Sequence, residues 1–278
     1  MILSNYHSHS TFCDGRSSME EFVKFAIAKG VKRYGFSSHA PIPFETPWTM
    51  VADDFPEYEA EFFRLKEKYK ESIELYLGLE VDYIHGCSDI KSDFFRKINL
   101  DYSIGSIHYL DCLGGNNYWS IDGPFDEFEK GLNTLYNGDI EAGTRRFFEI
   151  SGLMIEKGGF DVVGHVDKIT YHGRKYSGFD INKPEYQKLV LRLLEQIKAQ
   201  KLILEVNTKS LADHGITYPH QAFYETIARM EIPLMLNSDC HYPTNITAGF
   251  DITCKALSKA GIKYLMQLTE DGWKKESF

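Results

Sequence analysis

Seven short apolar segments alternate along this chain with charged, helix-like stretches, and that alternation restricts the folds available to it. The segments that predict strands are 1–6, 31–38, 73–83, 102–107, 161–166, 202–206 and 233–236. The clearest helical stretch between them is 186–201, in which Val190, Leu193 and Ile197 recur on one face. Strands that alternate with helices pair in parallel, and seven such steps without a dividing linker favour one α/β domain spanning 1–278, folded as a closed or nearly closed barrel.

The composition indicates a globular protein that acts on a small molecule. Hydrophobic residues make up 43% of the chain, enough for a substantial core, and the formal net charge of −9 argues against broad attraction to nucleic acid or to an anionic membrane. The chain has no run of about 20 apolar residues and no secretion signal at its start. Its five cysteines are scattered, with no CxxC spacing. We therefore expect a soluble cytoplasmic protein with reduced thiols, and the sequence leaves its oligomeric state open.

Two pairs of metal-ligand residues stand at opposite ends of the chain. His7 and His9 close the first predicted strand, and Asp239 and His241 follow the last. Residues two apart on a strand point to the same face, so each pair can present both side chains to one bound cation. The two pairs therefore predict a metal-dependent enzyme.

Further ligand-type residues end the strands between these pairs. They are His39, Glu80, His108 and His165. Because the carboxyl ends of all strands of a βα barrel meet at one face, we expect these side chains to converge there. A single histidine at a strand end is usually structural, and Asp14, in a turn before Gly15, has an alternative role as a turn or N-cap residue. The joint pattern is harder to explain by packing, so we include Asp14 among the predicted ligands.

Candidate substrate contacts lie in the predicted loops on the same face. A phosphate group needs fixed cationic donors, and the alternative for any basic loop residue is solvated surface charge. The candidates are Arg16, Lys168, Arg174 and Lys175. Asn207, at the end of the sixth predicted strand, could hydrogen-bond the substrate or a metal ligand, or serve as a structural cap.

Short motifs surround all of these residues and cover nearly the whole chain. They are His7-x-His9 with Asp14-Gly15, Ser38 to Pro41, Gly78 to Tyr83, Gly105 to Tyr109, Gly164 to Asp167, Glu205 to Thr208 and Ser238 to His241. Together they resemble the motifs of the PHP (polymerase and histidinol phosphatase) superfamily, specifically its histidinol-phosphatase branch. The resemblance implies a distorted (β/α)7 TIM-like barrel, in agreement with the number of predicted strands.

The resemblance also implies a centre of three divalent metal ions. One ion would be held by His7, His9, Glu80 and Asp239; a second by Glu80 as a bridging ligand, His108 and His165; and a third by Asp14, His39 and His241. Imidazole and carboxylate ligands without thiolate suit Zn²⁺, Mn²⁺, Fe²⁺ or Co²⁺.

The implied activity is hydrolysis of L-histidinol phosphate to L-histidinol and phosphate in histidine biosynthesis. We hypothesise that hydroxide activated by the metal centre attacks phosphorus in line, and we take Glu80, Asp239 and His241 as the catalytic residues. Asp239 or His241 is a candidate to protonate the leaving alkoxide, as is a water. Basic residues after the fifth-strand histidine bind phosphate in this branch, which makes Arg174 the first choice. The alternatives are a PHP phosphoesterase acting on a nucleotide or sugar phosphate, and a non-catalytic PHP module.

Overall fold

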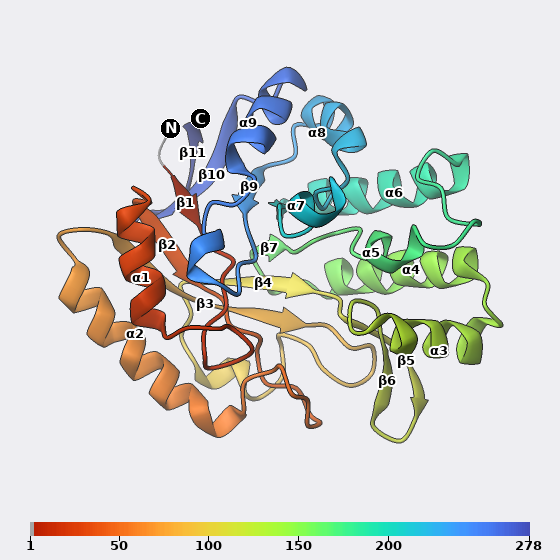
Figure 1. Ribbon diagram of the computed structural model, residues 1–278, viewed down its shortest axis with the longest axis horizontal. Helices are drawn as coiled ribbons and strands as arrows, with labels where there is room; N and C mark the ends of the chain where they lie inside the picture. Colours follow the sequence, from red (N-terminus) through yellow and green to blue (C-terminus); the bar gives the residue numbers. More distant parts are fainter. Residues whose placement is uncertain (1–2) are drawn as a thin grey trace.

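The computed structural model describes residues 3–278 and is built around one sheet of seven parallel strands (Figure 1). These strands are β1 (Ser4–Asn5), β2 (Arg33–Phe36), β3 (Glu74–Asp82), β4 (Tyr102–Ser106), β7 (Val162–Val163), β8 (Ile203–Asn207) and β9 (Leu234–Asn237). Their order in the sheet is β1-β2-β3-β4-β7-β8-β9, and every neighbouring pair is parallel. The prediction of an α/β fold with seven parallel strands is confirmed, although positions 1 and 2 of the first predicted strand lie outside the described residues.

The first and last strands approach each other, so the sheet curls into a nearly closed barrel. The backbone N–H of Tyr6 donates to Asn237 Oδ1 at 2.8 Å. Just beyond the strand ends, Ser8 and Cys240 form a parallel bridge, and the N–H of His9 donates to the carbonyl of Cys240 at 3.0 Å. The chain segments that carry the two predicted ligand pairs are thereby joined by backbone hydrogen bonds.

Helices surround the barrel on its outside (Figure 1). The longer helices are α1 (Met19–Ala28), α2 (Phe55–Tyr69), α3 (Phe125–Tyr136), α4 (Ile140–Lys157), α6 (Pro184–Gln200), α8 (Tyr224–Met230) and α9 (Phe250–Lys259). Helices of a single turn are α5 (Thr170–Gly173), α7 (Leu211–His214), η1 (Ala52–Asp54), η2 (Phe95–Lys97), η3 (Gln221–Phe223) and η4 (Pro243–Asn245). The Ser18 hydroxyl and the Glu21 carboxylate form a capping box that starts α1. Every helix formed by residues 3–278 is too short or too polar to span a lipid bilayer.

Two antiparallel hairpins were not predicted from the sequence. β10 (Tyr264–Thr269) and β11 (Gly272–Ser277) form one, and β5 (Tyr109–Gly114) and β6 (Asn117–Ser120) form the other. Leu268 of the first hairpin packs with Tyr6, Tyr102 and Met235 inside the barrel, at the amino ends of the strands. This hairpin therefore fills the floor of the barrel and leaves the opposite end for function.

Candidate metal centre

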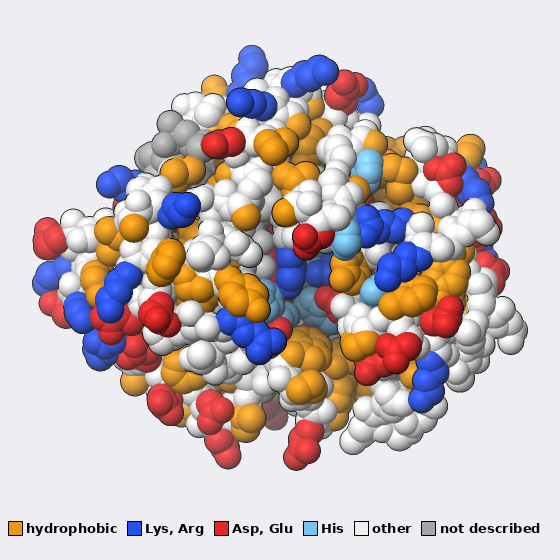
Figure 2. Space-filling view, viewed as in Figure 1, with side chains coloured by type: hydrophobic (Ala, Val, Ile, Leu, Met, Phe, Trp, Pro, Cys, Tyr) orange, Lys and Arg blue, Asp and Glu red, His pale blue; other side chains and the backbone are white. Residues whose placement is uncertain are grey.

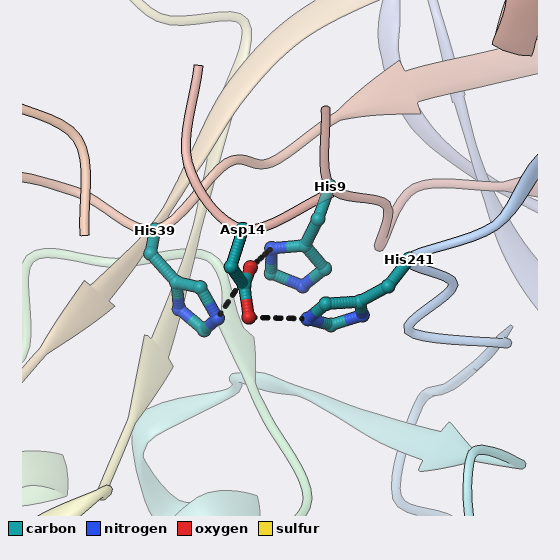
Figure 3. Close-up of side chains that lie close together, drawn as sticks. All are labelled: His9, Asp14, His39 and His241. Carbon is teal, nitrogen blue, oxygen red and sulfur yellow. Dashed lines mark ion pairs between the residues drawn. The ribbon is translucent and has the colours of Figure 1, made fainter. Parts of the chain in front are cut away.

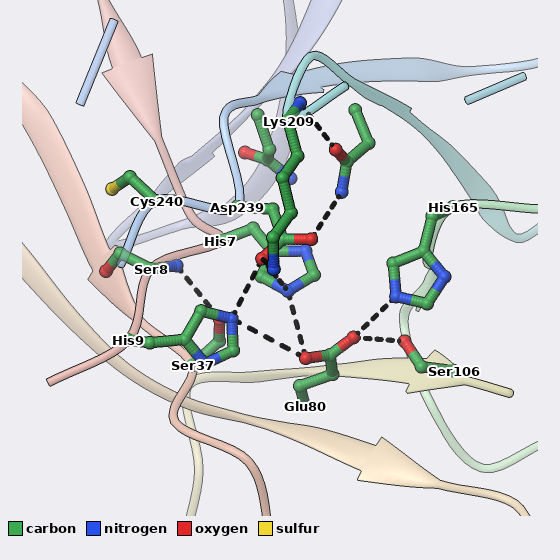
Figure 4. Close-up of polar contacts among 12 residues, drawn as sticks. His7, Ser8, His9, Ser37, Glu80, Ser106, His165, Lys209, Asp239 and Cys240 are labelled. Atoms are coloured by element: carbon green, nitrogen blue, oxygen red, sulfur yellow. Dashed lines mark hydrogen bonds and ion pairs between the residues drawn. The ribbon is translucent and has the colours of Figure 1, made fainter. Parts of the chain in front are cut away.

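Glu80, on β3, lies at the centre of the polar cluster at the carboxyl ends of the strands (Figure 4). Its Oε2 is 3.1 Å from His7 Nε2 and 3.0 Å from His39 Nδ1. Its Oε1 is 2.8 Å from His165 Nε2 and accepts a hydrogen bond from the Ser106 hydroxyl at 2.7 Å. One buried carboxylate thus contacts histidines that follow three different strands, as expected for a bridging ligand.

A second group of side chains lies around Asp14, towards the mouth of the barrel (Figure 3). Asp14 Oδ2 is 3.1 Å from His241 Nε2. Asp14 Oδ1 is 3.7 Å from His39 Nε2 and 4.0 Å from His9 Nδ1. The turn that contains Asp14 therefore brings its carboxylate to the strand-end histidines, and the prediction that Asp14 belongs with them agrees with this geometry.

Asp239 connects the two groups. Its Oδ1 is 3.1 Å from His9 Nε2 and 3.8 Å from His7 Nε2. Its backbone has φ 49°, a left-handed conformation that is uncommon for residues other than glycine. Such strain occurs most often at functional sites, where the surrounding structure holds it in place.

Buried carboxylates behind the histidines orient their rings. His7 Nδ1 lies 2.6 Å from Glu205 Oε1, and His108 Nδ1 lies 2.9 Å from Asp82 Oδ1. Each ring can donate its Nδ1 proton outward and direct Nε2 towards the centre, the arrangement common for metal-binding histidines. Glu205 and Asp82 belong to motifs recognised in the sequence, but no role was predicted for them. Their presence as acidic residues inside otherwise apolar strands could have indicated that they support the histidines.

Burial and neighbouring charges shift the pKa values of groups within the cluster. Burial would raise the pKa of the Glu80 carboxyl, but the imidazoles of His7 and His108 hold that pKa well below its ordinary value. Burial and the nearby rings of His241 and His39 lower the pKa of His9 well below its ordinary value. Ionised carboxylates and a neutral imidazole are the forms in which these groups bind metal ions.

The donor atoms fit divalent cations. Among residues 3–278, three sets of side chains offer ligand atoms that lie within 4.8 Å of one another inside each set. They are His9, Asp14, His39 and His241; His7, His9 and Asp239; and His39, Glu80 and His108. Four of these atoms, His7 Nε2, Asp14 Oδ1, His39 Nδ1 and Glu80 Oε2, are buried and make no hydrogen bond, although Glu80 Oε2 lies within 3.1 Å of the two imidazole nitrogens. Leaving polar atoms buried and unpaired is costly, and cations bound between them would remove that cost.

The three sets differ in detail from the predicted division of ligands. His9 joins the Asp14 set as well as the His7 set, and His39 joins Glu80 and His108. Among the described residues, His165 belongs to none of the sets, although it lies beside Glu80. All nine predicted ligands therefore come together, while their division among individual ions stays a prediction.

A cavity of about 330 Å³ opens onto this cluster, and Asp14, His39, His108 and His241 are in its wall. Figure 2 shows a hollow near the centre of this face, with histidine and basic side chains at its bottom. Two lysines line the cavity, Lys168 and Lys209. Lys168 is buried, with its Nζ 3.3 Å from Asp122 Oδ2, and Lys209 Nζ is 3.0 Å from Asp239 Oδ1.

The other predicted substrate contacts are placed differently. Arg16, Arg174 and Lys175 are exposed and are not among the described residues that line the cavity. Arg174 Nε donates to the carbonyl of Tyr171, and Lys175 Nζ lies 4.0 Å from the centre of the Phe125 ring. The turn α5 directs these two side chains outward, so their contact with substrate stays a prediction that the geometry does not favour.

Asn207 is fully buried behind the cavity wall. Its Nδ2 donates to Glu205 Oε2 and Asp239 Oδ2, both at 3.1 Å, and its Oδ1 accepts from the backbone N–H of Lys209. Of the roles proposed for it, support of a metal ligand fits these bonds, and direct contact with substrate is untested.

Sequence reasoning missed Lys209, Asp122 and Trp48. Lys209 lies two residues beyond Asn207, so it shares the strand end that had already been singled out. Asp122 follows β6, a strand that was not predicted from the sequence. Burial alone would raise the pKa of the Asp122 carboxyl, but the nearby Lys168 ammonium outweighs burial and lowers this pKa to about 2. Nothing in the sequence pattern distinguished Trp48 from the other aromatic residues.

Comparison with protein families and known sequences gives a consistent picture. The family model described as the PHP domain matches residues 5–209. The histidinol-phosphatase of Bacillus subtilis is 26% identical over 260 residues, which cover 88% of this chain and 96% of the relative. A Deinococcus radiodurans protein provisionally named a histidinol-phosphatase is 28% identical over 271 residues, which cover 93% of this chain and 94% of the relative.

Solved structures have the same fold. A Listeria monocytogenes protein provisionally named a histidinol phosphatase superposes with a TM-score of 0.82 at 25% identity, over 90% of this chain and 100% of the other. The histidinol phosphate phosphatase of Lactococcus lactis, solved with zinc, L-histidinol and phosphate, superposes with a TM-score of 0.75 at 20% identity, over 99% of each chain.

Proposed function

We propose that this chain, which belongs to the PHP domain family, is a histidinol-phosphatase: a phosphoric monoester hydrolase that converts L-histidinol phosphate to L-histidinol and phosphate in histidine biosynthesis. The observation that carries the proposal is the cluster of nine histidine and carboxylate side chains at the strand ends, four of which line a cavity that Lys168 and Lys209 also line. Metal ligands and fixed cations on one wall suit a phosphate dianion.

We propose three divalent ions for this site, with Zn²⁺, Mn²⁺, Fe²⁺ and Co²⁺ as candidates. The ligands are those predicted from the sequence: His7, His9, Glu80 and Asp239 for one ion, Glu80, His108 and His165 for the second, and Asp14, His39 and His241 for the third. Such ions activate a water as nucleophile and neutralise charge that develops on the phosphoryl oxygens. The contacts of Glu80 on both of its oxygens support its role as the bridge.

The lysines provide the other half of phosphate recognition. Lys168 and Lys209 line the cavity beside the metal ligands and can donate to the non-bridging phosphate oxygens. Lys209 Nζ is also 3.5 Å from His241 Nε2. Asp239 and His241 remain the side chains of this chain that we propose for protonating the leaving alkoxide, because His241 lines the cavity and its Nδ1 lies 3.7 Å from Asp239 Oδ1.

The metal requirement is tested by chelation. Exhaustive treatment with a chelator should abolish hydrolysis of histidinol phosphate, and titration with Mn²⁺ or Zn²⁺ should restore it, with ion stoichiometry measured by mass spectrometry. A metal-free chain that retains full activity would contradict the proposal.

The substrate is tested with a panel of phosphomonoesters. We expect kcat/KM for histidinol phosphate to exceed that for nucleoside monophosphates and sugar phosphates by more than about tenfold, which is about 1.4 kcal/mol of transition-state preference. A nucleotide that wins by this margin would replace histidinol phosphate as the substrate. The proposal includes a cytoplasmic location and no nucleic-acid or membrane partner, in keeping with the net charge of −9.

A further inference from the structure

A second cavity lies directly beside the metal centre. Its volume is about 470 Å³, and it shares Trp48, Ser120 and Gly123 with the wall of the first cavity. Nothing in the phosphate chemistry described so far uses this space. A molecule held by its phosphate at the metal ligands could therefore extend across Trp48 into the second cavity.

Aromatic rings form much of the second wall, and they run outward from the metal ligands. The Trp48 ring contacts His39, with ring centres 4.6 Å apart, and stacks on Tyr109 at 5.6 Å with an interplanar angle of 22°. Phe44 packs edge-on against Tyr109 at 5.4 Å and stacks on Tyr118 at 5.2 Å. Flat aromatic faces of this kind bind planar rings and cations.

The hairpin β5–β6 fixes this wall relative to the metal centre. Tyr109, the first residue of β5, follows the predicted ligand His108 directly. The backbone N–H of Ile121, just after β6, donates to the carbonyl of His108 at 3.0 Å. Both ends of the hairpin are thus joined to the predicted ligand His108, which places Tyr109 and Tyr118 beside the proposed metal centre.

The charges around the two cavities differ in a way that orients a substrate. Lys168 and Lys209 line the first cavity, on the side of β7 and β8, together with the acidic residues Asp14, Asp122 and Asp213. The carboxylates of Glu45 and Glu127 line the second cavity, which has one cation, Lys130, among its described lining residues. The proposed metal ions would add their positive charge to the lysines of the first cavity and favour an anionic group there, whereas the aromatic rings and carboxylates of the second cavity favour a cationic or polarisable ring.

We infer that the second cavity binds the imidazole end of the substrate, stacked among Phe44, Trp48, Tyr109 and Tyr118, and that it determines which phosphomonoester the enzyme prefers. The inference rests on the proposed function, because histidinol phosphate is the molecule that joins a phosphate to an imidazole through a short flexible chain. An imidazole is planar and is partly protonated near neutral pH, so it gains from both ring stacking and the nearby carboxylates.

The test compares two substrates in two variants. Histidinol phosphate carries the ring, and ethanolamine phosphate keeps the amine and the phosphate without it. In Phe44→Ala and in Tyr118→Ala, we expect KM for histidinol phosphate to rise about tenfold, which is the fold-change that the loss of one aromatic contact would cause. The value of kcat/KM for ethanolamine phosphate should stay within about twofold, since neither residue touches the phosphate site.

Three controls complete the experiment. Phe63→Ala removes an exposed phenylalanine from α2, remote from the site, and should change neither substrate. Tyr118→Phe keeps the ring and should keep the wild-type preference. Bound metal per chain, measured in every variant, shows that the metal centre is intact.

Each outcome has a distinct meaning. The inference is supported if the alanine variants lose activity towards histidinol phosphate and keep their activity towards ethanolamine phosphate. Unchanged preference in both alanine variants, or an equal fall for both substrates, overturns it while the proposed function stands. A wild-type enzyme that hydrolyses ethanolamine phosphate as well as histidinol phosphate overturns the proposed function, and with it the assignment of this cavity to an imidazole.

Discussion

The two ends of the barrel are built from the same strands and differ completely in chemistry. At the carboxyl ends, Glu80 and Asp239 lie among histidines whose polar atoms are only partly satisfied. At the amino ends, Tyr6 and Tyr102 pack with Leu268, and their hydroxyls are hydrogen-bonded. The mouth therefore keeps polar groups ready for ligands, while the floor uses its polar groups for stability.

The largest expected effect is at the mouth. Glu80→Ala should lower kcat/KM for histidinol phosphate by at least about a thousandfold, because it removes the carboxylate shared between proposed metal sites. His39→Ala should weaken one metal site selectively, and Glu80→Ala should damage two, as measured by metal content per purified chain. Equal metal loss in the two variants would contradict the bridging role of Glu80.

A smaller loss is expected from Lys209→Met, which removes a cation but no proposed metal ligand. We expect kcat/KM to fall about a hundredfold, as for the loss of one donor to a developing anion, with metal content retained. Lys66→Met, on the outer helix α2, is the matched control and should be neutral. A neutral Lys209→Met would remove this lysine from phosphate recognition.

The smallest effect is expected at the floor, and it should appear in stability instead of activity. The Tyr102 hydroxyl donates to the carbonyls of Tyr6 and Phe36, so Tyr102→Phe should lower the free energy of unfolding by about 1–2 kcal/mol. Urea titration would measure this change, with the exposed Tyr264→Phe as the unaffected control. A large loss of kcat in Tyr102→Phe would show that the two ends are not independent.

The strands and their ligands were predictable because both depend on local pattern. Apolar runs that end in a histidine or an acid mark the carboxyl ends of barrel strands, and Glu80 and His165 lie where that rule places them. One residue that shapes the floor, Gly78, also lies inside a motif recognised in the sequence, but its role depends on a contact with another strand. A side chain at Gly78, inside the motif that contains Glu80, would collide with the ring of Tyr102.

Features that depend on how the chain turns could not be predicted in the same way. Lys168 and Arg174 belong to one basic loop, but α5 leaves the first in the cavity and directs the second into solvent. The aromatic wall requires the β5–β6 hairpin to meet the segment around Phe44 and Trp48, far apart in sequence. The alternation of strands and helices contains no information about that contact.

The bridge between Ser8 and Cys240 has a consequence for how the enzyme is assembled. His9 and Asp239 are separated by 230 positions in the sequence, so the segment that carries His7 and His9 is made well before the one that carries Asp239 and His241. Ions shared by these residues would bind fully only after the last strand has docked beside the first. Binding of metal would then stabilise the closed barrel over forms in which these two segments are apart.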